Sequence, residues 1–189
     1  MAIETVNPAT GDVIETFEPH DDAEVERRIA QAFEAARTLR ATSYAQRATW
    51  MHATADVLEA DVNRAASMIT LEMGKPIVQS RAEVLKCAKN LRFYADNAES
   101  FLSPEHLDDP SAVSASAAGT VWQPLGVVLA VMPWNYPLWQ VIRFAAPALM
   151  AGNTGLLKHA SNVPQSALYL DELFEKGGFP AGCFRTLLI

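Results

Sequence analysis

The chain has 189 residues, the size of one domain, and its 15 basic and 22 acidic residues give a formal net charge of −7 at pH 7. This negative balance argues against nucleic acid or an anionic membrane as the main partner. Hydrophobic residues make up 50% of the chain and charged residues 20%. Such a composition is typical of a globular protein and excludes a largely disordered one.

The first hundred residues predict a β-hairpin followed by a helical region. A turn at residues 9–12 precedes an expected strand at residues 13–17. Four helices should follow: one capped by Asp21 or Asp22, one capped by Ser43, one at residues 61–73 ended by Gly74, and one at residues 76–101. For the first of these helices we expect an inward apolar face made of Val25, Ile29, Phe33 and Ala36, continued by Leu39 or by the stem of Arg40.

Residues 103–123 predict a two-stranded arm. A segment rich in Pro and Asp at residues 103–110 is followed by small alternating residues at 111–116, and Val121 and Trp122 should begin a more apolar strand. A ribbon of small residues has little core of its own. We therefore expect the arm to pair with another subunit of a homo-oligomer.

The remaining residues alternate between strand and helix patterns. The apolar run at residues 127–131 predicts a strand buried on both faces, and further strands are expected at 154–158 and 184–189. Helices are expected between them at residues 137–150 and 164–176. The fold class is therefore α/β, with a partial doubly wound, Rossmann-like parallel sheet (βαβαβ). The chain stops at Ile189, within this apolar run, so we expect it to be a fragment of a longer protein. Because the rest of the sheet would then be missing, we also expect an unpaired third strand that is prone to aggregation.

Ligands of such sheets bind beyond the carboxyl ends of the strands, where Asn135 and Lys158 lie in this sequence. The Asn135 amide could donate to a developing oxyanion, or it could cap the next helix. The cation of Lys158 and the hydroxyl of Ser161, with no acid between them, suit a coenzyme 2′-phosphate. The alternative for Lys158 is a solvated lysine at the end of a strand.

Arg143 interrupts an otherwise apolar helix, one turn after Trp139. A guanidinium in such a setting must be paired or face a cavity, so Arg143 could bind a substrate carboxylate or form a structural salt bridge. Cys183 has no neighbouring base to lower its pKa and is interpreted as a core residue, as is Cys87. The four histidines show no metal-ligand spacing, so no metal is expected.

The first ten residues carry no secretory signal, and the longest apolar stretches fall short of the roughly 20 residues that span a bilayer. Two cysteines are too few for a disulfide framework. We therefore expect a cytoplasmic protein with reduced thiols that does not enter a membrane.

Several blocks of the sequence together resemble the aldehyde dehydrogenase superfamily. They are Pro-Trp-Asn-Tyr-Pro at residues 133–137, Ala-Pro-Ala-Leu-Met-Ala-Gly-Asn-Thr at 146–154, the strand that ends in Lys158, Asn-Pro-Ala-Thr-Gly at 7–11, and Leu-Glu-Met-Gly-Lys-Pro at 71–76. The resemblance covers nearly the whole chain. It implies oxidation of a small-molecule aldehyde to the acid, with hydride transfer to a nicotinamide coenzyme.

The resemblance also implies roles for individual residues. Asn135 matches the oxyanion-hole amide, and Met132, Pro133 and Trp134 match residues that line the cofactor cleft. Lys158 and Ser161 match the adenosine-ribose contacts, and a serine in place of an acid resembles the NADP-preferring pattern, with NAD possible. His159 replaces the commoner proline, as in a bacterial subset that resembles succinate-semialdehyde dehydrogenases. Arg143 matches a position where such enzymes bind a substrate carboxylate.

The family's catalytic cysteine, glutamate base and pyrophosphate-binding glycine turn have no match in the chain. We therefore expect residues 1–189 to be an incomplete NAD(P)-binding domain that is inactive alone, with the catalytic domain absent. Its parts would be the hairpin and helices (1–102), a bridging arm (103–123) and the βαβαβ half (124–189). One alternative is a non-catalytic remnant that serves as a nucleotide-binding or oligomer-forming module. Another is a relative that reduces acyl-phosphates or acyl-CoA.

Overall fold

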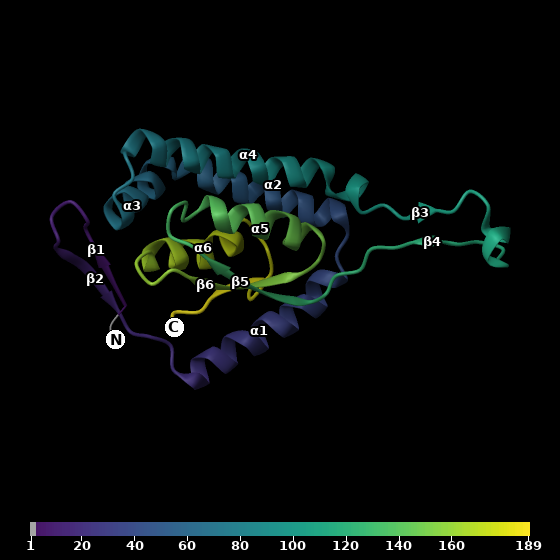
Figure 1. Ribbon diagram of the computed structural model, residues 1–189, viewed down its shortest axis with the longest axis horizontal. Coiled ribbons are helices and arrows are strands. Elements are labelled where there is room, and N and C mark those ends of the chain that lie inside the picture. The colour runs from purple at the N-terminus through teal and green to yellow at the C-terminus, as the bar shows by residue number, and fades with distance from the viewer. Residues whose placement is uncertain (1–2) are drawn as a thin grey trace.

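The computed structural model describes residues 3–189, which form four layers (Figure 1). A three-stranded parallel sheet lies between helix α1 on one side and helices α5 and α6 on the other, and helices α2, α3 and α4 form the outermost layer. The elements in chain order are β1 (Ile3–Val6), β2 (Val13–Phe17), α1 (Asp22–Arg40), α2 (Tyr44–Ala60), α3 (Val62–Met73), α4 (Ile77–Phe101), β3 (Glu105–His106), the 3-10 helix η1 (Pro110–Val113), β4 (Gly119–Thr120), β5 (Val127–Met132), α5 (Trp139–Met150), β6 (Thr154–His159), α6 (Pro164–Lys176) and β7 (Phe184–Thr186).

The predicted hairpin and helix boundaries are confirmed. Strands β1 and β2 pair in antiparallel fashion, and the Asp21 carboxylate accepts a hydrogen bond from the Glu24 amide at the start of α1. The Ser43 hydroxyl caps α2 in the same way by accepting from the Gln46 amide. Gly74 ends α3 with a φ of 74°, a left-handed conformation that favours glycine.

The apolar face predicted for α1 is confirmed at Ala36 and Leu39, which are buried, and at Val25, which packs on the core, but it is wrong at Ile29 and Phe33. Phe33 is 60% exposed and Ile29 is also exposed, whereas Arg28, Ala32 and Leu39 are buried. The centre of the buried face is therefore shifted from Ile29 and Phe33 to the neighbouring Arg28 and Ala32. Two features explain this: close packing of α1 on the sheet favours small side chains, and the buried Arg28 has polar partners on other elements. The Arg28 guanidinium donates to the Asp171 carboxylate and to the Thr186 carbonyl.

The parallel βαβαβ unit is confirmed, with the strand order β5-β6-β7. In the register of the first pair, Val131 lies beside Lys158 and Met132 beside His159, so both strands end at the same edge. Leu157, Phe174 and Phe184 are fully or almost fully buried in the core between the sheet and the helices. The sheet edge where β5 and β6 end is therefore held by a packed interior.

Strand β5 is not buried on both faces as predicted. Leu129 and Val131 are 59% and 69% exposed, while Ala130 on the opposite face is buried in the core. Successive side chains of a strand point to opposite faces, and α1 covers the first face only as far as Val127. Within residues 3–189, the outer edge of β5 also has no strand partner.

Strand β7 lies at the other edge of the sheet, and no strand within residues 3–189 pairs with its outer side, so aggregation through this strand stays a prediction. On the outer edge of β7, the Thr186 amide donates to the Asp171 carboxylate and the Thr186 carbonyl accepts from Arg28. Two residues later, the Leu188 amide donates to His20 Nδ1, and the Leu188 carbonyl accepts from the His20 amide. Side chains and backbone from distant segments thus satisfy the edge that we expected to be open.

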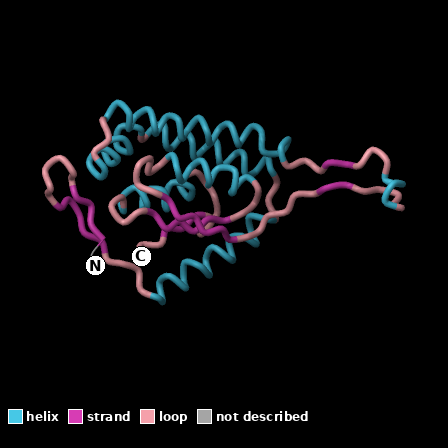
Figure 2. The backbone as a smooth tube through the Cα atoms, viewed as in Figure 1, coloured by secondary structure: helices cyan, strands magenta, loops and turns pink. Residues whose placement is uncertain are grey.

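Residues 103–123 form a projecting arm in which β3 and β4 pair in antiparallel fashion and η1 lies near the tip (Figure 2). The predicted strand at Val121 and Trp122 is absent, because both residues lie in an extended, exposed segment after β4. Pairing of the arm with another subunit stays a prediction. No helix in the described part of the chain combines the length and the apolar character needed to cross a bilayer.

Candidate active site

The loops after β5 and β6 lie side by side at the carboxyl edge of the sheet. Because Met132 pairs with His159, Asn135 lies three residues beyond one strand end, and Lys158 lies at the end of the neighbouring strand. Both are accessible, since Asn135 is exposed and Lys158 is half-buried. The structure therefore brings the two main predicted residues to one edge of the sheet.

Asn135 does not cap the following helix, so this alternative is excluded. At the start of α5, the amides of the N-cap residue Leu138 and of the first helical residue Trp139 both donate to the Glu83 carboxylate at 3.0 Å. Within residues 3–189 no hydrogen bond engages the Asn135 side chain. Its amide N–H groups are available to a ligand at the sheet edge.

A second buried glutamate caps the other helix that begins at this edge. Glu72 of α3 accepts from the Ser166 amide at 3.0 Å and from the Ser166 hydroxyl at 2.6 Å, in the first turn of α6. Desolvation by burial raises the pKa of Glu72. The N-termini of α5 and α6 would ordinarily attract a phosphate. Since carboxylates already occupy them, neither N-terminus is free to bind an anion.

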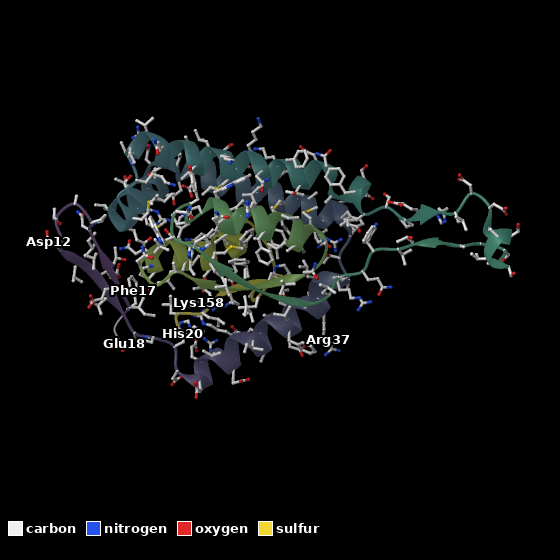
Figure 3. The ribbon with its side chains drawn as sticks, viewed as in Figure 1. Asp12, Phe17, Glu18, His20, Arg37 and Lys158 are labelled. Carbon is white, nitrogen blue, oxygen red and sulfur yellow. The ribbon has the colours of Figure 1, made fainter. Side chains whose placement is uncertain are left out.

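Lys158 and Ser161 lie after β6 on the accessible side of the sheet edge. Side chains alternate along β6, so Lys158 lies on the same face of the sheet as Leu156, which packs against Ala32 of α1 (Figure 3). Its ammonium donates to the His159 carbonyl at 3.0 Å, and it forms no ion pair in the described part of the chain. Ser161 is exposed. A cation and a hydroxyl without a carboxylate between them fit the 2′-phosphate of NADP.

His159 is a structural residue that the sequence did not reveal. Its Nδ1 accepts a hydrogen bond from the Ala160 amide at 2.9 Å, so its Nε2 carries the hydrogen that it donates to the Pro137 carbonyl at 2.8 Å. Desolvation by burial lowers the pKa of His159, which favours the neutral ring. The side chain links the end of β6 to the loop that carries Asn135.

Arg143 lies on the exposed side of α5, which corrects the expectation of a guanidinium among buried aromatic residues. It forms no ion pair within residues 3–189, so the structural salt bridge is not found there. One turn earlier, the Trp139 ring has the ammonium of Lys86 3.7 Å from its centre. Lys86 was missed because it is distant in sequence and lies on α4. The cation packed on Trp139 is therefore Lys86, and Arg143 lies one turn further along α5.

Met132, Pro133 and Trp134 connect β5 to the Asn135 loop. Met132 is half-buried, whereas Pro133 and Trp134 are exposed. Trp134 lines a cavity of about 370 Å³ between the hairpin and the sheet edge, together with Glu4, Val6, Pro8, Glu72, Met73 and Asn162. The predicted role of these three residues beside a coenzyme stays a prediction.

Neither cysteine is suited to act as a nucleophile. Cys183 is buried and desolvation raises its pKa to about 12. Cys87 is fully buried on α4, and its pKa is also raised by burial. Since the thiolate is the reactive form, both side chains are core residues, as predicted.

Residues 1–188 of the chain match the sequence pattern of the aldehyde dehydrogenase family. The succinate-semialdehyde dehydrogenase (NADP(+)) 1 of Mycobacterium tuberculosis is 60% identical over 189 residues, which is 100% of this chain and 41% of that protein. The succinate-semialdehyde dehydrogenase (NADP(+)) of Mycobacterium leprae is 57% identical with the same coverage. The chain thus spans 41% of the length of these curated relatives.

A solved structure is also similar. The succinic semialdehyde dehydrogenase of Streptococcus pyogenes, in complex with NADP+ as the cofactor, superposes with a TM-score of 0.93 at 33% sequence identity. The similarity covers 100% of this chain and 41% of that one. The arrangement of strands, helices and arm described above is therefore one that an experimentally determined enzyme also has.

Proposed function

Because the chain belongs to the aldehyde dehydrogenase family, we propose that it provides part of the NADP-binding domain and the oxyanion-hole amide of a dehydrogenase. The reaction would oxidise succinate semialdehyde, or a similar aldehyde that carries a carboxylate, to the acid. The observation that carries this proposal is the position of Asn135 and Lys158 on adjacent strand ends, both accessible from one edge of the sheet. The 60% identity to NADP(+) succinate-semialdehyde dehydrogenases supports the choice of coenzyme and substrate.

Within this proposal, Asn135 donates an N–H hydrogen bond to the oxygen of the aldehyde as negative charge develops there. The Lys158 ammonium and the Ser161 hydroxyl hold the 2′-phosphate, and bound NADP supplies the acceptor for the hydride. No residue of the chain is assigned as nucleophile, because both thiols are buried. We therefore expect the 189 residues alone not to oxidise an aldehyde.

The spacing of Asn135 and Arg143 supports a short carboxylate-bearing substrate. The Gln140 amide donates to the Tyr136 carbonyl, so helical hydrogen bonding begins directly after Asn135. Arg143 lies eight residues after Asn135 on α5, which begins at Trp139, and long side chains lean toward the N-terminus of their helix. A guanidinium that leans in this way toward Asn135 would leave room for a chain of a few carbon atoms between the two groups. Lys86 adds a second positive charge beside Trp139.

We also propose that the β3–β4 arm joins this chain to another copy in a homo-oligomer, and that the protein works in the cytoplasm. The arm projects from the body and presents short strands of exposed residues (Figure 2). Exposed ribbons of this kind offer unpaired backbone groups to a partner. Cytoplasmic function is supported by two cysteines that are both unbridged.

A chimera tests the proposed function. Residues 1–189 of this chain would replace the matching part of the Mycobacterium tuberculosis enzyme, which supplies the remaining residues (hereafter the chimera). We expect a folded chimera that reduces NADP in the presence of succinate semialdehyde, with the parent enzyme as positive control. A chimera that folds, as judged by a cooperative thermal transition, but oxidises no aldehyde would favour a non-catalytic module.

Arg143→Ala should raise the KM of the chimera for succinate semialdehyde about 10- to 100-fold, because a hydrogen bond to a charged group contributes about 1.5–3 kcal/mol. The KM for butyraldehyde, which lacks the carboxylate, should hardly change. Steady-state kinetics with both aldehydes give the comparison. An equal rise for butyraldehyde would mean that Arg143 has only a structural role.

Ser161→Glu should shift the preference of the chimera from NADP toward NAD by about tenfold or more, because the new carboxylate repels the 2′-phosphate. Ser161→Gln introduces a side chain of the same shape as glutamate but without its charge, and it serves as the matched control. The measurement is the ratio of kcat/KM for the two coenzymes. If both variants keep the original ratio, Ser161 does not lie beside the 2′-phosphate.

A further inference from the structure

Side chains from three other parts of the chain hold the loop that carries Asn135. Glu83 of α4 accepts from the amides of Leu138 and Trp139, directly after the loop. Lys75, between α3 and α4, pairs with the second carboxylate oxygen of Glu83. These contacts join residues 55 and 56 positions apart in the sequence, so the loop is fixed by tertiary structure rather than by its own local turns.

Lys75 also contacts the loop itself. Its ammonium lies 3.7 Å from the centre of the Tyr136 ring, and Tyr136 directly follows Asn135. A cation at this distance from an aromatic face is attracted to it, and more strongly where water is excluded. The same ammonium therefore contacts both Glu83, whose carboxylate binds the amides at the end of the loop, and Tyr136, at the centre of the loop.

The Lys75–Glu83 pair is buried, with side-chain exposures of 7% and 1%. Desolvation makes a buried ion pair a poor source of stability compared with apolar side chains of the same volume. A pair in this place is better explained by what it positions. Its Glu83 carboxylate caps α5, and its Lys75 ammonium packs on Tyr136, so both partners act on the residues around Asn135.

His159 holds the loop from the opposite side. Its Nε2–H donates to the Pro137 carbonyl, two residues after Asn135, while the Ala160 amide fixes the orientation of the ring through Nδ1. The charged neighbour of His159 is Lys158. His159 therefore couples the strand end that carries the proposed phosphate-binding lysine to the loop that carries the amide.

We propose that Lys75, Glu83 and His159 are positioning residues that fix the Asn135 amide relative to Lys158. None of the three contacts the substrate in this arrangement, and each acts through the loop at residues 134–138. The kinetic part of this proposal rests on the proposed function, whereas the structural part concerns the 189-residue chain itself.

The structural part is tested by nuclear magnetic resonance on the 189-residue chain. Glu83→Gln keeps an oxygen acceptor but loses the charge that makes such hydrogen bonds about twice as strong. We expect the Leu138 and Trp139 amides to exchange with solvent about tenfold faster, and the side-chain amide signal of Asn135 to move. Glu72→Gln is the matched control, because Glu72 caps α6 in the same manner but has no hydrogen bond to the Asn135 loop.

Two results would overturn the structural part. One is an Asn135 signal that responds to Glu72→Gln as much as to Glu83→Gln. The other is a chain without the dispersed spectrum of a folded protein. His159→Gln provides a second variant with a smaller risk of unfolding, since glutamine can still donate to the Pro137 carbonyl. We expect it to retain the fold and to move the Asn135 signal less than His159→Ala does.

The kinetic part is tested in the chimera with two aldehydes. Glu83→Gln and His159→Ala should lower kcat about tenfold for both succinate semialdehyde and butyraldehyde, with little change in the KM for NADP. A loss confined to the KM for NADP would contradict a positioning role toward Asn135. If the chimera has no activity at all, the proposed function fails, but the magnetic resonance result still decides whether the three residues position the loop.

Discussion

Asn135→Ala should lower kcat of the chimera by about 100- to 1,000-fold, the loss that follows removal of one oxyanion-hole donor in other enzymes. The physical reason is that the Asn135 amide is exposed at the sheet edge, while Glu83 satisfies the helix amides that Asn135 could otherwise have capped. The loss should therefore appear in the chemical step rather than in protein stability. Steady-state kinetics and a thermal unfolding curve of the same variant separate the two effects.

Asn63→Ala, at an exposed position on α3, is a suitable control and should leave kcat unchanged. Butyraldehyde and succinate semialdehyde should be affected alike, because the oxyanion forms on either aldehyde. A decrease in kcat of less than about threefold in Asn135→Ala would show that the amide does not stabilise the reacting oxygen. A large decrease in melting temperature would mean that the side chain is structural.

Arg28→Ala should decrease the free energy of unfolding of the 189-residue chain by about 3–5 kcal/mol, the usual cost of removing one partner of a buried ion pair. The Arg28 side chain is 11% exposed and that of Asp171 is 9% exposed. The substitution leaves the Asp171 carboxylate with the more distant guanidinium of Arg185, at 3.6 Å, and the Thr186 carbonyl without its Arg28 donor. Urea unfolding, followed by circular dichroism, measures the difference.

Arg92→Ala is the matched control, because Arg92 also bonds two acceptors, but these are the exposed carboxylates of Asp56 and Glu59. Pairs of this kind contribute about 1 kcal/mol or less. If both variants lose the same stability, the Arg28 network does not hold α1 on the sheet. The comparison also tests why β7 has a satisfied outer edge, since Arg28 and Asp171 together occupy the Thr186 backbone groups.

The sequence predicted the site edge because the rule for parallel sheets is independent of side-chain detail. Recognising strands at 127–131 and 154–158 was sufficient to place Asn135 and Lys158 at neighbouring strand ends, and the register confirms this placement. Helix starts at Asp21 and Ser43 were predictable for a similar reason. A capping residue acts on amides two or three positions away, so its effect is local.

The contacts that could not be predicted join residues far apart in the chain. Glu72 and Glu83 were assigned to ordinary helices, yet they cap α6 and α5 across separations of 94 and 55 residues. The orientation of α1 was missed because Phe33 and Ile29 indicate an inward face by hydrophobicity alone. The actual inward face depends on the partners of Arg28, which lie 143 and 158 residues away.

The polar partners on the outer edge of β7 could not be predicted for the same reason. Apolar patterns showed that residues 184–189 form a strand, but they could not show that His20 and Asp171 would satisfy its outer backbone groups. The exposed Leu129 and Val131 identify β5 as the strand with the open face in residues 3–189. Burial of a strand on both faces depends on the length of the covering helix, which a single strand pattern does not contain.

The most direct test of the central claim is a crystal structure of the chimera with NADP bound. The account predicts that the 2′-phosphate lies within hydrogen-bonding distance of Lys158 Nζ and Ser161 Oγ, and that the nicotinamide ring lies on the same side of the sheet edge as the Asn135 amide. A coenzyme bound elsewhere, or one whose nicotinamide ring lies on the opposite side of the molecule from Asn135, would contradict it.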